Sequence, residues 1–254
     1  MLNFLKYVLA TIVGLLIFFF ISMLIMVGII ASAAADDEVK IKEGSVLELK
    51  LDKKITERDP KNPLNELGFS FGGLSSTDGL DQIKAAIRRA KADENVEGIF
   101  LNMTFVDAGM GKLEEIRNEL IDFKKSGKFI VSYADISTEK AYYLASVSDK
   151  IYLNPMGTIE FNGMSSELFF FKKLLDKLNI EAQIFKVGTY KSAVEPFFLE
   201  KASDANREQL NSFLNSMNTY QLQNIAKSRK MTVAALKDVQ DNLLVRDPED
   251  AKRY

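Results

Sequence analysis

The sequence predicts an α/β fold, in which a parallel sheet is covered by helices and preceded by one membrane-spanning helix. Two observations support this prediction. Short apolar runs alternate with amphipathic stretches over several cycles after residue 80, which is typical of strands linked by crossover helices. A long uncharged apolar run also stands near the N-terminus, apart from these cycles.

The N-terminal run predicts a membrane anchor. Residues Val8 to Ile30 carry no charge, and a helix of this length at ~1.5 Å per residue crosses a hydrocarbon core of ~30 Å. Lys6 precedes the run and acidic residues 36–38 follow it, so the positive-inside rule places the N-terminus in the cytoplasm and the body outside. Ala33 and Ala35 form an A-x-A pattern, as in a cleaved signal peptide, but the length favours an uncleaved anchor.

We therefore expect three segments: an anchor over residues 1–35, a first strand with a long loop over 36–79, and an α/β repeat over 80–254. The stretch "EGSVLELKLDKKI" alternates apolar and charged residues, as a half-buried strand does. The next stretch, "TERDPKNPLNELGFSFGGLSSTDG", is rich in proline and glycine and predicts a loop.

Two amphipathic helices and two strands are predicted next. The first helix has an apolar face of Leu80, Ile83, Ile87 and Ala90, with Ser76, Thr77 or Asp78 as its cap. The second has Leu113, Ile116, Leu120 and Phe123 and ends near Gly127. The strands are "EGIFLNM" and "KFIVSY".

The remaining elements continue the alternation. "TEKAYYLASVSD" predicts a short helix with Ser137 as N-cap, and "KIYLN" a strand that Pro155 stops. "SELFFFKKLLDKLNI" predicts a helix with residues 169–171 in its core, and "EAQIFKV" predicts one more strand. Two helices follow, in "SDANREQLNSFLNSMNTYQLQNIAKSRK" and "MTVAALKDV".

Composition excludes several kinds of chemistry. The chain has no cysteine and no histidine, so cysteine nucleophiles, disulfides, Cys or His metal sites and Ser-His-Asp triads are excluded. A net charge of -2 provides no basic footprint for nucleic acid. The acidic residues do not cluster at ligand spacing, and we predict neither a metal nor a cofactor. Catalysis then depends on Ser, Thr, Lys, Tyr, Asp or Glu.

A lysine in "VGTYKSAVEPFF", residues 187–198, is the candidate for such chemistry. Lys191 follows the predicted strand "EAQIFKV", and ligand sites in parallel sheets form beyond the carboxyl ends of strands. Small and apolar residues flank it, and Gly188 permits a tight turn. Burial lowers the pKa of a lysine from ~10.4, and the neutral amine can then act as a general base. The alternative is a solvated surface lysine.

The motifs resemble a known family. "FKVGTYKSAVEPF", together with "AYYLASVSDKIYLNPMGTIEFNGM" and "LLDKLNIEAQIFKV" before it, is similar to the signal peptide peptidase A (protease IV) family, in its long two-repeat, membrane-anchored form. The resemblance implies a crotonase-like or Clp-protease-like fold and a Ser-Lys dyad that degrades cleaved signal peptides. It also implies a homotetramer in the bacterial inner membrane, with its body on the periplasmic side.

In the family's long form the first repeat supplies the lysine and the second supplies the serine. The resemblance therefore assigns Lys191 as general base, supported by Gly188, Thr189, Tyr190 and Ser192. In single-repeat members the serine stands at the position that Glu139 occupies here. Since no serine of this chain is a good nucleophile, we expect it to be an N-terminal half with a second repeat after Tyr254.

The expected partners are signal peptides and other apolar peptides, the lipid bilayer and further copies of the chain, but not nucleic acid. Asp135, Glu139 and Glu195 are carboxylates that can orient Lys191 or bind substrate, without an assigned role. One alternative is a non-catalytic, membrane-tethered oligomeric assembly module of the same fold. A second is a crotonase-type acyl-CoA enzyme, against which an outward-facing body argues.

Overall fold

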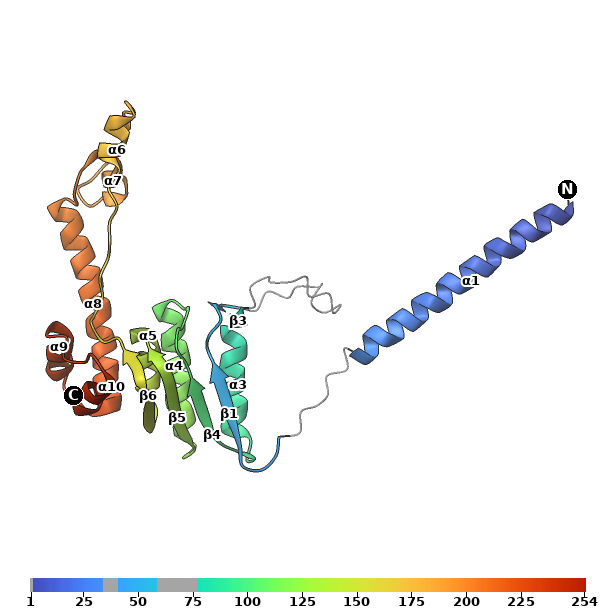
Figure 1. Cartoon of the computed structure of the whole chain (residues 1–254), viewed down its shortest axis with the longest axis horizontal. Coiled ribbons are helices and arrows are strands. Elements are labelled where there is room, and N and C mark those ends of the chain that lie inside the picture. Colours follow the sequence, from blue (N-terminus) through green and yellow to red (C-terminus); the bar gives the residue numbers. More distant parts are fainter. Residues whose placement is uncertain (1, 34–40, 59–76) are drawn as a thin grey trace.

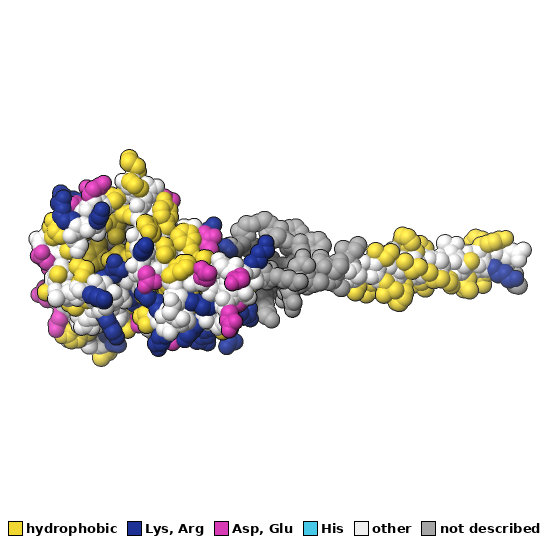
Figure 2. Space-filling view, turned by 90° about the horizontal axis from the view of Figure 1, so that it is seen from below, with side chains coloured by type: hydrophobic (Ala, Val, Ile, Leu, Met, Phe, Trp, Pro, Cys, Tyr) yellow, Lys and Arg dark blue, Asp and Glu magenta, His cyan; other side chains and the backbone are white. Residues whose placement is uncertain are grey.

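The computed structural model describes residues 2–33, 41–58 and 77–254 (Figure 1). Helix α1 (Leu2–Ala33) forms the N-terminal part, and Asn3–Gly28 within it is long and apolar enough to cross a membrane. None of this segment is buried against the protein, and Figure 2 shows hydrophobic side chains along the length of α1. The predicted apolar N-terminal helix is confirmed, and it fits a single-pass membrane anchor.

The main sheet contains four parallel strands in the order β1 (Ser45–Lys50), β4 (Val96–Asn102), β5 (Phe129–Ser137) and β6 (Lys150–Ile159). A second, two-stranded sheet pairs β2 (Ile55–Thr56) with β3 (Asp78–Gly79), also in parallel. Helices α3 (Leu80–Ala92), α4 (Met110–Lys124) and α5 (Glu139–Ala145) connect successive strands. The α/β fold with a parallel sheet and flanking helices is therefore confirmed. Most of the long loop predicted before residue 79 lies outside the described residues.

The core lies between the sheet and helices α3 and α4. All four predicted apolar residues of each helix are buried, and they pack with Ile99, Leu101 and Ile130 of the central strands. Each such side chain contributes about 1.5–3 kcal/mol when it leaves water. Helical periodicity located these faces correctly because both helices bury them against the sheet of the same chain.

Two helix caps differ from the prediction. The N-cap of α3 is Gly79, without a side-chain cap, because Asp78 and Gly79 pair as a strand with β2. The predicted cap Ser76 lies outside the described residues, and Thr77 precedes that strand. For α5 the N-cap is Thr138, whose hydroxyl accepts a hydrogen bond from the amide of Ala141. Ser137 is instead the last residue of β5.

Strand β6 does not stop at Pro155. Its pairing with β5 passes from Ala134–Leu153 to Ile136–Thr158, so residues 154–157 form a bulge. Gly157 is required there, because a Cβ at this position would lie 2.0 Å from the backbone oxygen of Asp135. Within the described residues β6 is an edge strand, where a proline without an N–H removes no essential ladder bond.

We call residues 160–202 the arm. It leaves β6, carries α6 (Lys172–Lys177), a 3₁₀ turn (Ser192–Val194) and α7 (Glu195–Phe198), and returns into α8 (Asp204–Arg229). In Figure 1, α6 and α7 lie beyond the far end of α8 from the sheet. The helices α9 (Val233–Asp241) and α10 (Pro248–Arg253) complete the chain. The predicted helices at α8 and α9 are confirmed.

The arm confirms one predicted helix only in part and contradicts the strand predicted after it. The helix expected in "SELFFFKKLLDKLNI" shortens to the six residues of α6, and Phe169 is 69% exposed instead of lying in a helix core. The segment expected as the strand "EAQIFKV" has no strand partner among the described residues. Both segments are apolar enough to be buried, but within the described residues the first packs only in part, through Phe171 against Phe197, and the second pairs with no strand.

A buried arginine joins three helices. Arg117 of α4 is 1% exposed and donates hydrogen bonds to Ser146 Oγ at 2.8 Å and to the backbone oxygen of Tyr143. It also donates to the backbone oxygen of Asn224 at 2.8 Å and to Ser228 Oγ at 2.7 Å, both on α8. The guanidinium carbon lies 4.6 Å from the centroid of the Tyr143 ring. Arg117 thus fixes α8 and α5 onto α4.

A second polar contact joins α5 to α9. Gln240 Nε2 donates to Glu139 Oε1 at 2.6 Å, and Asn218 Nδ2 of α8 donates to Gln240 Oε1 at 3.0 Å. The pKa of Glu139 is raised to about 7, mainly by burial and in smaller part by the Glu160 carboxylate. Hydrogen bonds from Gln240 and from the backbone of Gly163 oppose that shift.

Replacing Arg117 should destabilise the whole domain. Arg117→Met is expected to lower the free energy of unfolding by about 3 kcal/mol or more, because it leaves buried acceptors on two helices unpaired. Urea unfolding of the detergent-solubilised chain, followed by circular dichroism, measures this. Arg88→Met is the matched control, since Arg88 is 63% exposed and its partner Glu119 keeps a second ion pair with Lys84 at 3.7 Å, so the loss should be at most about 1 kcal/mol. Equal effects of the two variants would contradict the role of Arg117.

Stability should fall as Glu139 ionises. A carboxyl whose pKa rises from 4.5 to about 7 on folding binds its proton more tightly in the folded state. The stabilisation that comes from this bound proton is therefore complete below the pKa of the unfolded state. As the pH rises to about 7 it is lost, and the free energy of unfolding falls by an amount on the order of 2–3 kcal/mol. In Glu139→Gln the free energy of unfolding, measured with urea, should differ less between pH 5 and pH 8 than it does in the wild type. An unchanged pH dependence in the variant would show that Glu139 does not titrate in this range.

Candidate functional site

The candidate lysine lies in a turn at the end of the arm. We call residues 186–199 the lysine loop. Gly188 has φ of +99°, in the left-handed region that favours glycine, so the predicted tight turn is present. A Cβ at Gly188 would lie 3.9 Å from Cγ of Lys191, so the turn and the lysine side chain are neighbours. Lys191 itself precedes the 3₁₀ turn that leads into α7.

The surroundings of Lys191 differ from the prediction. Lys191 is exposed, and its apolar neighbour Val187 is 89% exposed, so the described residues do not form the expected apolar enclosure. The lysine also does not follow a sheet strand, because residues 181–187 are unpaired and the sheet ends at β6. The amine therefore lies on a surface of this chain and not in a closed pocket.

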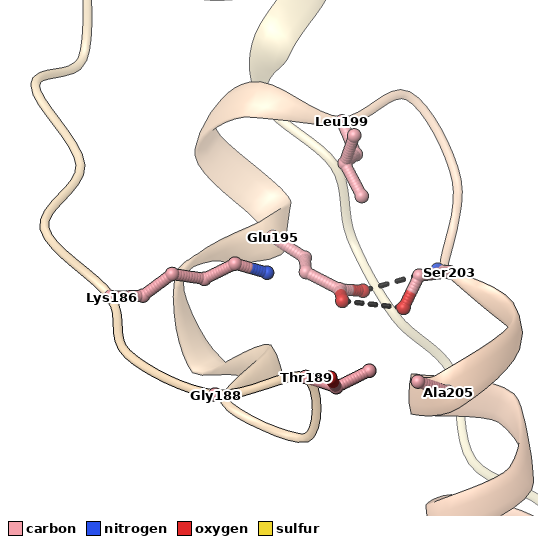
Figure 3. Close-up of a pocket in the computed structure, with 7 residues that line it drawn as sticks. All are labelled: Lys186, Gly188, Thr189, Glu195, Leu199, Ser203 and Ala205. Atoms are coloured by element: carbon pink, nitrogen blue, oxygen red, sulfur yellow. Dashed lines mark hydrogen bonds between the residues drawn. The ribbon is translucent and has the colours of Figure 1, made fainter.

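The residues predicted to support Lys191 shape and hold the lysine loop, and within the described part of the chain they make no hydrogen bond to the Lys191 amine. Tyr190 Oη donates a hydrogen bond to Glu208 Oε2 on α8 at 3.1 Å, and this carboxylate raises the pKa of Tyr190. Thr189 and Gly188 line a cavity of about 450 Å³ beside α8 (Figure 3). Among the described residues neither the Thr189 nor the Ser192 hydroxyl is hydrogen-bonded to Lys191.

The carboxylates named from the sequence are dispersed over the fold. Asp135 lies opposite the β6 bulge and accepts hydrogen bonds from Tyr133 Oη and Asn154 Nδ2, both at 2.8 Å. Glu139 joins α5 to α9 as described above. Glu195 alone lies in the lysine loop, where it is completely buried and bonded to α8. The sequence named Glu195 as a candidate but did not indicate its partners.

No nucleophile meets the lysine within the part of the chain that the structure describes. Ser137 is buried at the end of β5, and Ser192 lies in the lysine loop directly after Lys191. Among the described residues no hydroxyl is hydrogen-bonded to the Lys191 amine, and no group of three or more Asp or Glu side chains is arranged to hold a metal ion. The arrangement offers the exposed Lys191 amine on a fixed loop, available to a second surface.

Arg117 and Tyr143 were missed as functional positions, although both influence where the loop lies. Arg117 appears in the sequence as one charged residue of an amphipathic helix, a position at which arginine is normally solvated. It lies at the border of the apolar stripe, four residues after Leu113 and three before Leu120, so its spacing is compatible with burial, but its charge predicts a side chain that reaches water. The buried position follows only from the packing of α8 against α4 and α5.

Comparison with known proteins agrees with the resemblance of the motifs. The model of peptidase family S49 matches residues 122–252, about half of the chain. "Protease 4" of Haemophilus influenzae is 38% identical over 169 residues, which cover 62% of this chain and 28% of that protein. "Protease 4" of Salmonella typhi is 35% identical over 174 residues, which cover 66% of this chain and 28% of that protein.

A plant relative, the chloroplastic serine protease SPPA of Arabidopsis thaliana, is 32% identical over 178 residues, covering 70% of this chain and 25% of the relative. The matched region spans about a quarter of the length of each of these relatives. A solved structure of an enoyl-CoA hydratase/isomerase family protein from Silicibacter pomeroyi covers 80% of this chain at 11% identity. Its TM-score of 0.31 is too low to support an argument.

The family match runs from the end of α4 to α10 and includes the arm with Lys191. Relatives named as proteases, one of them as a serine protease, align with 62–70% of the chain. The resemblance to signal peptide peptidase A is therefore confirmed, and the chain belongs to peptidase family S49.

Proposed function

We propose that this chain supplies the general-base lysine of a membrane-anchored Ser-Lys endopeptidase that degrades cleaved signal peptides. The nucleophilic serine comes from a second repeat. One observation carries the proposal: Lys191 stands exposed on a loop that is fixed to α8, while the described residues bring no serine to it. The family match adds the reaction class, since relatives of this chain are named as proteases.

The chemistry requires one proton carrier. The neutral amine of Lys191 takes the proton of the serine hydroxyl as the serine oxygen attacks the peptide carbonyl. The ammonium then returns this proton to the departing amine, which leaves an acyl-enzyme ester. Water, activated in the same way by Lys191, hydrolyses the ester and regenerates both groups. Lys191 must be enclosed for this cycle, and the second repeat provides the enclosure.

The arm supports an assembly between repeats. Phe185 is 93% exposed, Val187 and Phe169 are also exposed, and all three lie on the arm. Exposed apolar groups gathered on one segment are typical of interaction surfaces. We propose that the second repeat and further copies of the chain cover them, in a homo-oligomer that the family resemblance makes a tetramer.

The anchor supports the location and the substrate class. Helix α1 supports a location beside a bilayer, and the charges that flank it in the sequence support a body on the periplasmic side of the bacterial inner membrane. Cleaved signal peptides, which carry apolar segments, remain in or near that bilayer. We propose the same three segments as before: the anchor up to residue 35, the first strand and its loop up to residue 79, and the α/β repeat from residue 80.

An assembly module is the second candidate. The same exposed Lys191, with no serine among the described residues, is also what a non-catalytic repeat of a peptidase family would show. In that case the arm serves association alone. The two candidates differ in whether activity depends on the Lys191 amine.

Lys191→Ala should abolish peptide hydrolysis in native membranes. With the substitution made in the organism's own gene, hydrolysis of an apolar fluorogenic peptide by isolated membranes should fall at least about 100-fold, because the general base is removed. Lys177→Ala is the control, since Lys177 is an exposed lysine on α6 of the same arm. Activity within two-fold of wild type for Lys191→Ala would favour the assembly module.

The 254-residue chain should be inactive alone. Purified in detergent, it is expected to hydrolyse the same peptide no faster than its Lys191→Ala variant. Hydrolysis by the isolated chain that disappears on Lys191→Ala would show that the nucleophile is in this chain, and the requirement for a second repeat would be wrong.

A further inference from the structure

Glu195 makes the most completely satisfied polar contact of the arm. Its side chain is 0% exposed, and its carboxylate accepts hydrogen bonds from three donors at the start of α8. Ser203 Oγ donates to Oε1 at 2.6 Å and the Ser203 amide donates to Oε2 at 3.1 Å (Figure 3). Asn206 Nδ2 also donates to Oε2, at 2.9 Å. These bonds tie α7 directly to the N-terminus of α8.

The contact is built for a charged carboxylate. Burial alone would raise the pKa of Glu195, but the hydrogen bonds from Ser203 and Asn206 and the charge of Lys186 together lower it. Figure 3 shows the Lys186 amine directed toward Glu195, and this amine also lies 5.3 Å from the centroid of the Phe198 ring. The N-terminus of a helix stabilises negative charge as well.

Glu195 is also close to Lys191 along the chain. Only the 3₁₀ turn Ser192–Val194 separates the two, and the Glu195 amide donates to the Ser192 backbone oxygen. Two further contacts hold the same loop: Tyr190 with Glu208, and the amide of Phe171 with the Pro196 backbone oxygen at 2.7 Å. The Tyr190 contact is exposed, whereas the Glu195 contact is buried, so Glu195 contributes most to the position of the loop.

We propose that Glu195 is a positioning residue for the peptidase reaction: its carboxylate locks the lysine loop onto the N-terminus of α8 and so determines where the Lys191 amine meets the serine. This inference rests on the proposed function. A displacement of about 1 Å of a catalytic group can cost about 100-fold in rate, so a loose loop lowers turnover even when substrate still binds.

The test compares Glu195→Gln and Glu195→Ala with the control Glu200→Gln, in which an exposed carboxylate of the arm is replaced. Glutamine retains one acceptor oxygen but turns an N–H₂ group toward the donors of α8. In native membranes we expect kcat to fall about 10-fold for Glu195→Gln and about 100-fold for Glu195→Ala, with KM within two-fold of wild type. Glu200→Gln should match wild type in both parameters.

Hydrogen exchange of the purified 254-residue chain supplies a readout that does not depend on activity. In both Glu195 variants the amides of residues 186–199 should exchange at least about 10-fold faster, while those of α4 (residues 110–124) keep the wild-type rate. Faster exchange in α4 as well would mean general unfolding and would overturn the proposal, as would an unchanged rate in residues 186–199.

The Lys191→Ala membranes separate this inference from the proposed function. If Lys191→Ala is inactive but both Glu195 variants retain wild-type kcat, the positioning role is wrong and the Ser-Lys mechanism stands. If Lys191→Ala is active, both proposals fail together. If kcat/KM falls in the Glu195 variants because KM rises, Glu195 acts on substrate binding, and the positioning role is overturned.

Discussion

The Arg117 guanidinium is the interaction on which the placement of the candidate site depends. A charged group this deeply buried needs acceptors for its donors, and both terminal nitrogens of the guanidinium find them on two other helices, whereas Nε has no hydrogen-bond partner among the described residues. Because two of those acceptors belong to α8, the 26 residues of that helix are fixed at the core end. An α-helix of this length is ~39 Å long, so α8 transmits the geometry of the core to the arm. Glu195 then fixes the lysine loop at the other end.

Periodicity predicted the elements that bury their apolar face within the chain, and it failed where they do not. Helices α3 and α4 pack on the sheet of the same chain, so their spacing located all of their buried apolar residues. The arm is equally apolar, but its residues face outward, and a pattern cannot indicate whether the covering surface belongs to the same repeat. The helix caps failed for a different reason. Asp78 was recruited into a strand pair with residues far away in sequence.

For the candidate site, the sequence named Lys191 and Glu195 but not the partners that hold them. Lys191 and Gly188 stand in one short motif, so a local pattern was enough to select them. The partners of Glu195 lie eight and eleven residues later, at Ser203 and Asn206, in a stretch that indicates an ordinary helix N-cap. Arg117 is more distant still, since its contacts on α8 lie more than 100 residues away. Such contacts depend on tertiary packing, which a single sequence does not display.

The bulge in β6 has a consequence for the behaviour of the chain before assembly. An exposed strand edge is a template on which strands of other molecules can pair, and this leads to aggregation. Residues 154–157 interrupt the regular pleat of β6, and Pro155 removes one donor from that edge. A foreign strand therefore finds no continuous ladder along β6. The sheet is protected from uncontrolled growth at this edge, while the extended, unpaired residues 181–187 lack any such interruption and stay open to pairing.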